Sequence, residues 1–300
     1  MKLKIAYFGT PDFSAYFLEK LLKDKDLPVE IKLVVTQPDK KVGKKQVLTP
    51  STVKEVAKKN NIPVKEKVVP EDLKELDLAL LFAYGEIIPK EILDAPKHGF
   101  WNIHPSLLPK YRGAAPVAGA LINGEQETGV TLMKMDEKVD HGPIIAQEKL
   151  AIEPKEKRLE LTIRLVELGY QIFKRVISDV SEKSPYQVDL STVWLLRYDM
   201  LEEQDHSKAT YTAILTKKDG FIEVEKLKSK NEGQKIFNLF RGLYPWPGVW
   251  TKVVINGKEK RLKITDVNLE NGQLVIKKVQ LEGKNEVTFE QFQDAYGLRL

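Results

Sequence analysis

The stretch GFWNIHPSLLPKYRGAAP, residues 99–116, begins as a strand and continues through two proline-marked turns. Side chains two positions apart on a strand leave the same face, so Asn102 and His104 are expected to lie side by side. Pro105 has no backbone N–H, so regular strand pairing is expected to stop just after His104. An amide and an imidazole at a strand end can polarise one small polar group, although the same pair also suits a hydrogen-bonded core.

The residues before this stretch predict a βαβ unit. Residues 3–8 form an apolar run typical of a buried strand, and Thr10 and Pro11 are expected to be the N-cap and first residue of a helix. A second strand is expected at residues 31–35, which implies a parallel sheet with a right-handed crossover. The first turn has one glycine, Gly9, whereas a dinucleotide-binding fingerprint has three, so NAD binding is not expected.

From residue 209 the pattern changes to short alternating strands, which are expected at residues 210–215, 249–255, 261–269 and 274–281. Asn256-Gly257 and Asn271-Gly272 are strong hairpin signals. The chain is therefore predicted to be an α/β protein: a Rossmann-like, mostly parallel sheet with helices on both faces, followed by a small antiparallel OB-like β-barrel domain. The expected organisation is a first domain at residues 1–180, a linker at 181–206 and a second domain at 207–300.

Composition excludes several classes of site. The 300 residues include no cysteine, so a disulfide, a thiolate metal site and a cysteine nucleophile are all excluded. The amino terminus, MKLKIAYFGT, has too short an apolar run for a signal peptide, and no stretch of about 18 apolar residues occurs. A cytoplasmic protein that does not span a membrane is therefore expected.

Positive charge is concentrated in two places. The formal net charge is +5, and residues 207–300 carry 17 Lys and Arg against 11 Asp and Glu, so all of the excess lies there. Residues 36–50, TQPDKKVGKKQVLTP, are expected to form a long loop that carries Lys40, Lys41, Lys44 and Lys45. Such clusters suit a polyanionic partner such as nucleic acid, although a lysine-rich solubilising surface is also consistent with the charge alone.

Further motifs occur in order along nearly the whole chain. They are GTPDFS at 9–14, TQPDK at 36–40, FAYGEIIP at 82–89, TGVTLMKMDEKVDHGPII at 128–145 and YPWPGVWT at 244–251. Together with residues 99–116, they closely resemble the folate-dependent formyltransferases. The resemblance implies that the first domain is catalytic and that the second binds tRNA.

The resemblance also implies specific site residues. It implies a catalytic set of Asn102, His104 and Asp140. It implies folate contacts from two turns, formed by Ser106, Leu107, Leu108 and Pro109 and by Tyr84, Gly85 and Ile87. It implies tRNA contacts from Lys40, Lys41, Lys44, Lys45 and Arg112. For Arg112 a second role, bracing its loop by bonding to carbonyl groups, is also open.

Formyl transfer to an amine is acyl transfer, and the implied catalytic set suits that chemistry. Asn102 can donate a hydrogen bond to a developing oxyanion without carrying a charge. His104 can act as a donor and as a proton shuttle near neutral pH, and Asp140 can orient it and favour its charged form. No covalent intermediate is required.

The reaction implied by the resemblance transfers a formyl group from 10-formyltetrahydrofolate, as co-substrate, to the amino group of initiator methionyl-tRNA. Its product is formylmethionyl-tRNA for translation initiation. Two alternatives are open: a formyltransferase for a small amine, such as a ribonucleotide or an amino sugar, and an RNA-binding protein without folate chemistry. A small amine needs neither the lysine-rich loop nor a basic second domain. A monomer without a metal ion is expected.

Some positions depart from the family pattern or leave a role open. His141 stands where the family more often has threonine, and Trp101 stands where smaller residues are common. A metal site formed by His98, His104, Asp140 and His141 matches no common ligand spacing and is not expected. The linker contains an apolar run at residues 193–198, and the sequence leaves open whether this run packs on the first domain.

Overall fold

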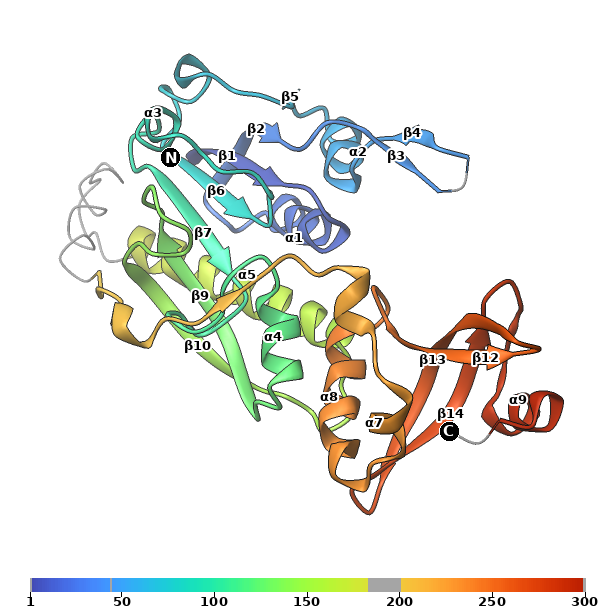
Figure 1. Cartoon of the computed structure of the whole chain (residues 1–300). Helices are drawn as coiled ribbons and strands as arrows, with labels where there is room; N and C mark the ends of the chain where they lie inside the picture. Colours follow the sequence, from blue (N-terminus) through green and yellow to red (C-terminus); the bar gives the residue numbers. More distant parts are fainter. Residues whose placement is uncertain (1, 44, 183–200, 299–300) are drawn as a thin grey trace. The chain divides into compact units, whose positions relative to one another are not determined.

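The computed structural model describes residues 2–43, 45–182 and 201–298 (Figure 1). These residues form two compact units, which we call the first unit and the second unit. The first unit comprises Met1–Gly113, Thr128–Leu150 and Thr162–Tyr211, and the second comprises Ala114–Glu127, Ala151–Leu161 and Thr212–Leu300. Two segments from the first part of the chain therefore belong to the same unit as the carboxy-terminal residues. The apolar run at 193–198 lies outside the described residues.

The first unit is built on a seven-stranded sheet with the order β10-β9-β7-β6-β1-β2-β5 (Figure 1). β1 pairs in parallel with β2 and β6, β6 with β7, and β2 with β5, whereas β9 runs antiparallel to β7. The mostly parallel sheet predicted from the sequence is confirmed. Its strands are β1 Leu3–Gly9, β2 Val29–Val35, β5 Val64–Lys65, β6 Leu78–Phe82, β7 Phe100–His104, β9 Glu127–Lys134 and β10 Ile144–Ala151.

Helices cover both faces of this sheet. Along β1, Tyr7 stacks on Phe17 of α1, whereas Phe8 belongs to the core cluster that contains Ile92 and Leu93 of α3. Adjacent side chains of a strand point to opposite faces, so a strand buried on both faces is apolar at nearly every position. The helices are α1 Asp12–Lys23, α2 Thr52–Lys59, α3 Lys90–Leu93 and α5 Arg158–Glu182, with 3-10 turns at Pro70–Asp72 and His206–Lys208.

The start of α1 differs by one residue from the prediction. The helix begins at Asp12, with Pro11 rather than Thr10 as its N-cap. The hydroxyl of Thr10 instead donates to Tyr84 O at 2.8 Å, so it ties the end of β1 to the turn after β6. The Thr10 side chain therefore serves a tertiary contact, and α1 begins without a side-chain cap bond.

Two short strand pairs also differ from the prediction. Residues 36–50, expected as a loop, contain a hairpin of β3 Lys40–Val42 and β4 Val47–Thr49, in which β-branched residues favour extended backbone. Of the strand expected at 210–215, only β11 Tyr211–Thr212 forms. It pairs with β8 Arg112–Gly113 and not with the antiparallel sheet of the second unit.

The second unit contains a four-stranded antiparallel sheet with the order β12-β13-β14-β15. Both predicted hairpin turns form, at Asn256-Gly257 and Asn271-Gly272, and all four residues have the positive φ that such two-residue turns require. The antiparallel sheet is confirmed, whereas its closure into an OB-like barrel stays a prediction. The strands are β12 Val249–Ile255, β13 Lys258–Glu270, β14 Gln273–Leu281 and β15 Glu286–Thr288.

Two helices of the second unit approach each other closely. A Cβ placed on Gly242 would lie 2.6 Å from Ile122 Cγ1 and 3.0 Å from Ala118 O, so glycine permits the contact between α4 and α8. The helix α9 was not predicted, although its start has a recognisable signal: Thr288 Oγ1 accepts a bond from Gln291 N at 3.2 Å. The helices are α4 Pro116–Ile122, α7 Val224–Lys228, α8 Gly233–Leu243 and α9 Phe289–Tyr296, with 3-10 turns at Lys217–Gly220 and Lys230–Glu232.

Asp24, at the end of α1, gives the first unit a pH-dependent contact. It accepts hydrogen bonds from Lys174 Nζ at 2.6 Å and from the Tyr170 hydroxyl, both on α5, and these bonds lower the pKa of Asp24 from 3.8 to about 2. A depressed folded-state pKa stabilises the protein above about pH 4, and the contribution is lost as the pH falls toward about 2. We expect Asp24→Asn to lower Tm at neutral pH and to flatten the dependence of Tm on pH over this acidic range.

Thermal denaturation at a series of pH values measures this effect. Asp26→Asn, two residues away on the exposed surface, is the control and should keep the wild-type pH dependence. Parallel curves for wild type and Asp24→Asn would show that the contact does not contribute to acid sensitivity.

Candidate active site

Three side chains of the first unit converge at one carboxylate oxygen. Asn102 Nδ2 on β7 donates to Asp140 Oδ1 at 3.2 Å, and His104 Nδ1, two residues along the same strand, lies 3.5 Å from that oxygen. The other oxygen, Asp140 Oδ2, accepts a bond from Gly113 N at 2.7 Å. The structure therefore brings together all three residues of the implied catalytic set, in the arrangement expected from the spacing of Asn102 and His104.

Both ring nitrogens of His104 face hydrogen-bond acceptors. Nε2 lies 3.0 Å from the carbonyl oxygen of Tyr111, and Nδ1 faces Asp140. A carbonyl and a carboxylate can only accept, so a ring nitrogen bonds to its partner here only as a donor. His104 is buried, so its orientation is fixed by these two contacts. The arrangement can stabilise negative charge and can move a proton between Asp140 and a group bound beside Nδ1.

Three non-glycine residues near the implied catalytic set have left-handed backbone conformations. Ala83, Tyr111 and Asp140 have φ values of 55°, 61° and 48°. Non-glycine residues in this conformation cost free energy and persist where the surrounding structure over-determines them. Ala83 follows β6, Tyr111 supplies the carbonyl partner of His104, and Asp140 supplies the shared carboxylate. The main chain is therefore held in costly conformations at three points around the convergent side chains.

The turn at Ser106, Leu107, Leu108 and Pro109 directly follows β7 and is held by residues of β9 and β10. Thr131 Oγ1 on β9 donates to Ser106 O at 2.7 Å and accepts from Leu108 N at 3.1 Å. Gln147 Nε2 on β10 donates to Leu108 O at 3.0 Å. Neither Thr131 nor Gln147 was predicted from the sequence. Thr131 lies opposite His104 in the pairing of β7 with β9, and this register is not visible in the sequence alone.

The second turn with expected folate contacts follows β6, the neighbour of β7. Tyr84 is buried, and burial raises the pKa of its hydroxyl to about 12. Gly85 has a φ of 89°, a conformation that favours glycine, and Ile87 is 84% exposed. Because β6 and β7 are parallel neighbours, both turns emerge at the same edge of the sheet, as the carboxyl ends of parallel strands do.

The lysine-rich segment forms the hairpin of β3 and β4, which we call the lysine hairpin (residues 40–49). In Figure 1 it extends beyond α2. Lys41 and Lys45 are exposed, Lys40 Nζ donates to Gln37 Oε1, and Lys44 lies outside the described residues. Three apolar side chains of the hairpin are also more than half exposed: Val42, Val47 and Leu48. The hairpin therefore presents both positive charge and apolar surface to solvent.

Arg112 differs from the other residues expected to contact tRNA. Its guanidinium belongs to a residue that is only 2% exposed, and it donates to Gln204 Oε1 at 2.7 Å and lies 2.8 Å from His206 Nδ1. This placement favours the bracing role over a phosphate contact, because the guanidinium is buried and engaged with neighbouring side chains, and the tRNA contact of Arg112 stays a prediction. Gln204 and His206 were not predicted, since the sequence around them has no periodicity.

His141, whose role the sequence left open, packs against His206. The two rings stack at 3.9 Å between centroids, and His141 Nδ1 lies 2.6 Å from Asp136 Oδ2. His141 and His104 thus have different carboxylate partners. In the described part of the chain, no group of three or more His, Asp and Glu side chains is arranged to hold a metal ion.

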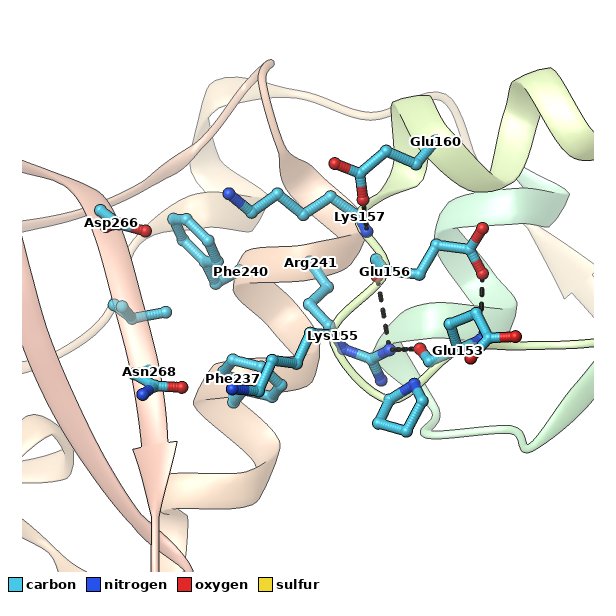
Figure 2. Close-up of a pocket in the computed structure, with 12 residues that line it drawn as sticks. Glu153, Lys155, Glu156, Lys157, Glu160, Phe237, Phe240, Arg241, Asp266 and Asn268 are labelled. Atoms are coloured by element: carbon cyan, nitrogen blue, oxygen red, sulfur yellow. Dashed lines mark hydrogen bonds between the residues drawn. The ribbon is translucent and has the colours of Figure 1, made fainter.

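A pocket of about 760 Å³ lies in the second unit and contains none of the residues of the implied catalytic set (Figure 2). At this pocket Arg241 donates to Asn238 Oδ1 at 2.8 Å and to the carbonyl oxygens of Glu153 and Glu156, both at 3.4 Å. Burial lowers the pKa of Arg241. These bonds fix residues 153–156 on α8. The other charged lining residues have both signs, so they do not select a ligand of one charge: Glu153, Lys155, Glu156, Lys157, Glu160 and Asp266.

None of the helices in the described part of the chain combines the length and the apolar character of a membrane-spanning segment.

Known protein families match most of this chain. The formyl transferase family matches residues 1–177, and the formyl transferase C-terminal domain matches residues 214–273. A methionyl-tRNA formyltransferase from Caldicellulosiruptor saccharolyticus is 36% identical over 99% of this chain and 98% of its own length. One from Staphylococcus aureus is 38% identical over 89% of this chain and 79% of its own.

A solved structure of low sequence identity shares the fold. A 4-N formyltransferase from Francisella tularensis matches with a TM-score of 0.62 and 19% identity, over 88% of this chain and 97% of that one. At this identity the likeness concerns the fold alone. The sequence matches go further, since one covers more than half of the chain and the relatives exceed 30% identity along most of it. This chain belongs to the formyl transferase family.

Proposed function

We propose that this protein transfers the formyl group of 10-formyltetrahydrofolate to the α-amino group of initiator methionyl-tRNA. The observation that carries the proposal is the convergence of Asn102 Nδ2 and His104 Nδ1 on Asp140 Oδ1. The relatives that match almost end to end are named for this reaction. Since formylmethionyl-tRNA serves translation initiation, we propose that the protein acts in the cytoplasm, as a monomer.

The catalytic residues divide the work of acyl transfer. The amine attacks the formyl carbon, negative charge develops on the formyl oxygen, and the bond from that carbon to the folate nitrogen breaks. The Asn102 amide has two N–H groups, one of which donates to Asp140, and the other can donate to this oxygen. His104 Nδ1 can share that role. Asp140 can accept the proton that the attacking amine loses, and His104 can pass a proton toward the leaving nitrogen.

The two turns after β6 and β7 are the proposed folate site. The folate supplies a formyl group on a weakly basic nitrogen that can leave. Ser106, Leu107, Leu108 and Pro109 would contact it partly through backbone groups, because the Ser106 and Leu108 main chain is held by Thr131. Tyr84, Gly85 and Ile87 would contact it from the neighbouring turn. The exposed Ile87 suits an apolar ring, and a solved N-formyltransferase from Helicobacter canadensis with the same fold binds folinic acid.

The choice of methionyl-tRNA over a small amine rests on the lysine hairpin and on the net positive charge of residues 207–300. Lys40, Lys41, Lys44 and Lys45 are the proposed tRNA contacts. A ribonucleotide or an amino sugar would have no use for a charged hairpin that extends into solvent. Phosphate contacts by lysine position a nucleic acid without reading its sequence.

Formylation of charged initiator and elongator methionine tRNAs, measured side by side with 10-formyltetrahydrofolate, tests this proposal. We expect the initiator tRNA to be formylated with the higher kcat/KM. Formylmethionyl-tRNA serves only to start protein chains, so the enzyme has to distinguish initiator from elongator tRNA. Free methionine and an amino sugar nucleotide are the matched small amines and should be formylated slowly. Efficient formylation of a small amine with no reaction on either tRNA would overturn the proposal.

A further inference from the structure

Gln204 joins the carboxy-terminal part of the first unit to the loop that carries Asp140. The residue is 5% exposed. Its Nε2 donates to the carbonyl oxygen of Asp140 at 3.0 Å and to that of Gly142 at 2.7 Å. Its Oε1 accepts from Arg112 at 2.7 Å. One side chain therefore holds the main chain on both sides of His141.

The orientation of the Gln204 amide is determined by its partners. The guanidinium of Arg112 can only donate, so the amide oxygen must face it. The carbonyl oxygens of Asp140 and Gly142 can only accept, so the amide nitrogen must face them. A buried amide with three compatible partners is fully specified, and each missing bond would leave a buried polar group unsatisfied.

The network reaches the Asp140 carboxylate by two routes. The first is the bond from Gln204 to the carbonyl of Asp140 itself. The second passes through Arg112, because the next residue, Gly113, donates its N–H to Asp140 Oδ2 at 2.7 Å. Gln204 thus contacts both the loop that carries the carboxylate and the strand that supplies its backbone donor.

The loop needs such support because its conformation is costly. Asp140 has a φ of 48°, in the left-handed region. Gly142 approaches the end of β9 so closely that a Cβ on it would lie 2.1 Å from Lys134 O. A segment that combines a left-handed aspartate with so close a contact keeps its geometry only when its surroundings hold it.

We propose that Gln204 is a positioning residue that sets where the Asp140 carboxylate lies relative to Asn102 and His104. The inference rests on the proposed function for the identity of the reaction. Gln204 touches Asp140 only through main-chain oxygens, so it acts on catalysis through the place of Asp140 and not by touching substrate. A displacement of about 1 Å at a reacting group can cost about 10²-fold in rate.

Kinetics of Gln204→Ala, measured as kcat and KM for methionyl-tRNA and 10-formyltetrahydrofolate, test the inference. We expect kcat to fall about 10- to 100-fold while both KM values stay within about twofold, because misplaced chemistry differs from lost binding. In an Asp140→Asn background the same substitution should cause no further loss, since its effect passes through the carboxylate. Gln171→Ala, an exposed glutamine on α5, is the control and should have wild-type kinetics.

Gln204→Glu separates positioning from packing. Glutamate keeps the size of the side chain and an acceptor for Arg112, but its carboxylate cannot donate to the two carbonyl oxygens. We expect it to be impaired like the alanine variant. Wild-type turnover of Gln204→Glu would overturn the inference, as would an equal loss from Gln204→Ala with and without Asp140→Asn.

Amide hydrogen exchange at Gly113 provides a readout that does not depend on activity. This N–H donates to Asp140 Oδ2, so its protection should fall in Gln204→Ala if the carboxylate moves. Unchanged protection at Gly113 in a folded variant would overturn the inference. If the wild type fails to formylate methionyl-tRNA, the proposed function fails, while Gly113 exchange still tests the position of Asp140.

Discussion

Replacing His104 with alanine should lower kcat for formyl transfer by about 10²–10⁴-fold, the usual cost of losing a positioned acid–base group. Nε2 lies 3.0 Å from Tyr111 O and Nδ1 lies 3.5 Å from Asp140 Oδ1, so alanine removes the group that lies between these two acceptors. Single-turnover kinetics with saturating 10-formyltetrahydrofolate and methionyl-tRNA measure this effect. Binding of a folate analogue should be unchanged, because the proposed folate contacts come from the turns and not from the imidazole.

Asp140→Asn should cause a loss of similar order, since the amide has the same shape but no negative charge and accepts a proton poorly. Asp136→Asn is a matched control in the same loop. Asp136 Oδ2 lies 2.6 Å from His141 Nδ1 and does not contact the implied catalytic set. The turnover of the Asp136→Asn variant should therefore remain within a few-fold of wild type. A folded His104→Ala protein with near wild-type turnover would remove the histidine from the mechanism.

The strand pattern around β7 predicted half of this site from local chemistry. Asn102 and His104 alternate with apolar neighbours on a strand that Pro105 ends, and their side chains do meet at one oxygen of Asp140. The period of a strand is two residues, so the relation between these two residues depends on almost nothing else in the chain. The mostly parallel sheet was predictable for the same reason, because continuous apolar runs such as residues 3–8 imply burial on both faces.

The position of Asp140 could not be predicted from local chemistry. The register of β7 with β9 pairs Trp101 with Lys134, so the loop after β9 starts at the far end of β7 from His104 and must fold back to reach it. The contacts that hold it there are the close approach of Gly142 to Lys134 and the bonds from Gln204. Gln204 is 64 residues away from Asp140 in a segment without periodicity, and only the resemblance to a family pointed to Asp140 at all.

The second unit shows a similar limit. Its hairpins follow from Asn-Gly turns, which require positive φ and so have a strong local signal. The domain limits expected from the sequence, residues 1–180 and 207–300, are two continuous stretches of chain. The second unit also contains residues 114–127, which come from within the first of these stretches. That association depends on the fit of α4 against Gly242 of α8, a contact between residues more than 100 positions apart in the sequence. Periodicity describes one element at a time and contains no information about such a fit.

The lysine hairpin was predicted as a charged loop. Its lysines are expected to have a large effect on the formylation of methionyl-tRNA. Replacing Lys40, Lys41, Lys44 and Lys45 with alanine should lower kcat/KM for methionyl-tRNA by roughly 10²-fold. Each lost charge contact costs about 0.7 kcal/mol, and the four costs add up to a factor of this order. Binding of a folate analogue should not change, because the proposed folate turns lie after β6 and β7. Removing a lysine that neutralises one phosphate should also flatten the slope of log affinity against log salt by about 0.9 on a duplex.

A matched variant separates local contacts from long-range attraction. It removes four lysines elsewhere on the first unit, each paired with a nearby carboxylate: Lys23, Lys32, Lys65 and Lys74. Both variants have the same net charge, so a general electrostatic attraction would slow them equally. We expect the hairpin variant to lose far more tRNA formylation and to lose part of the rate difference between initiator and elongator tRNA. If the two variants behave alike, the hairpin contributes charge but no specific contact, and the acceptor end must be recognised by other residues.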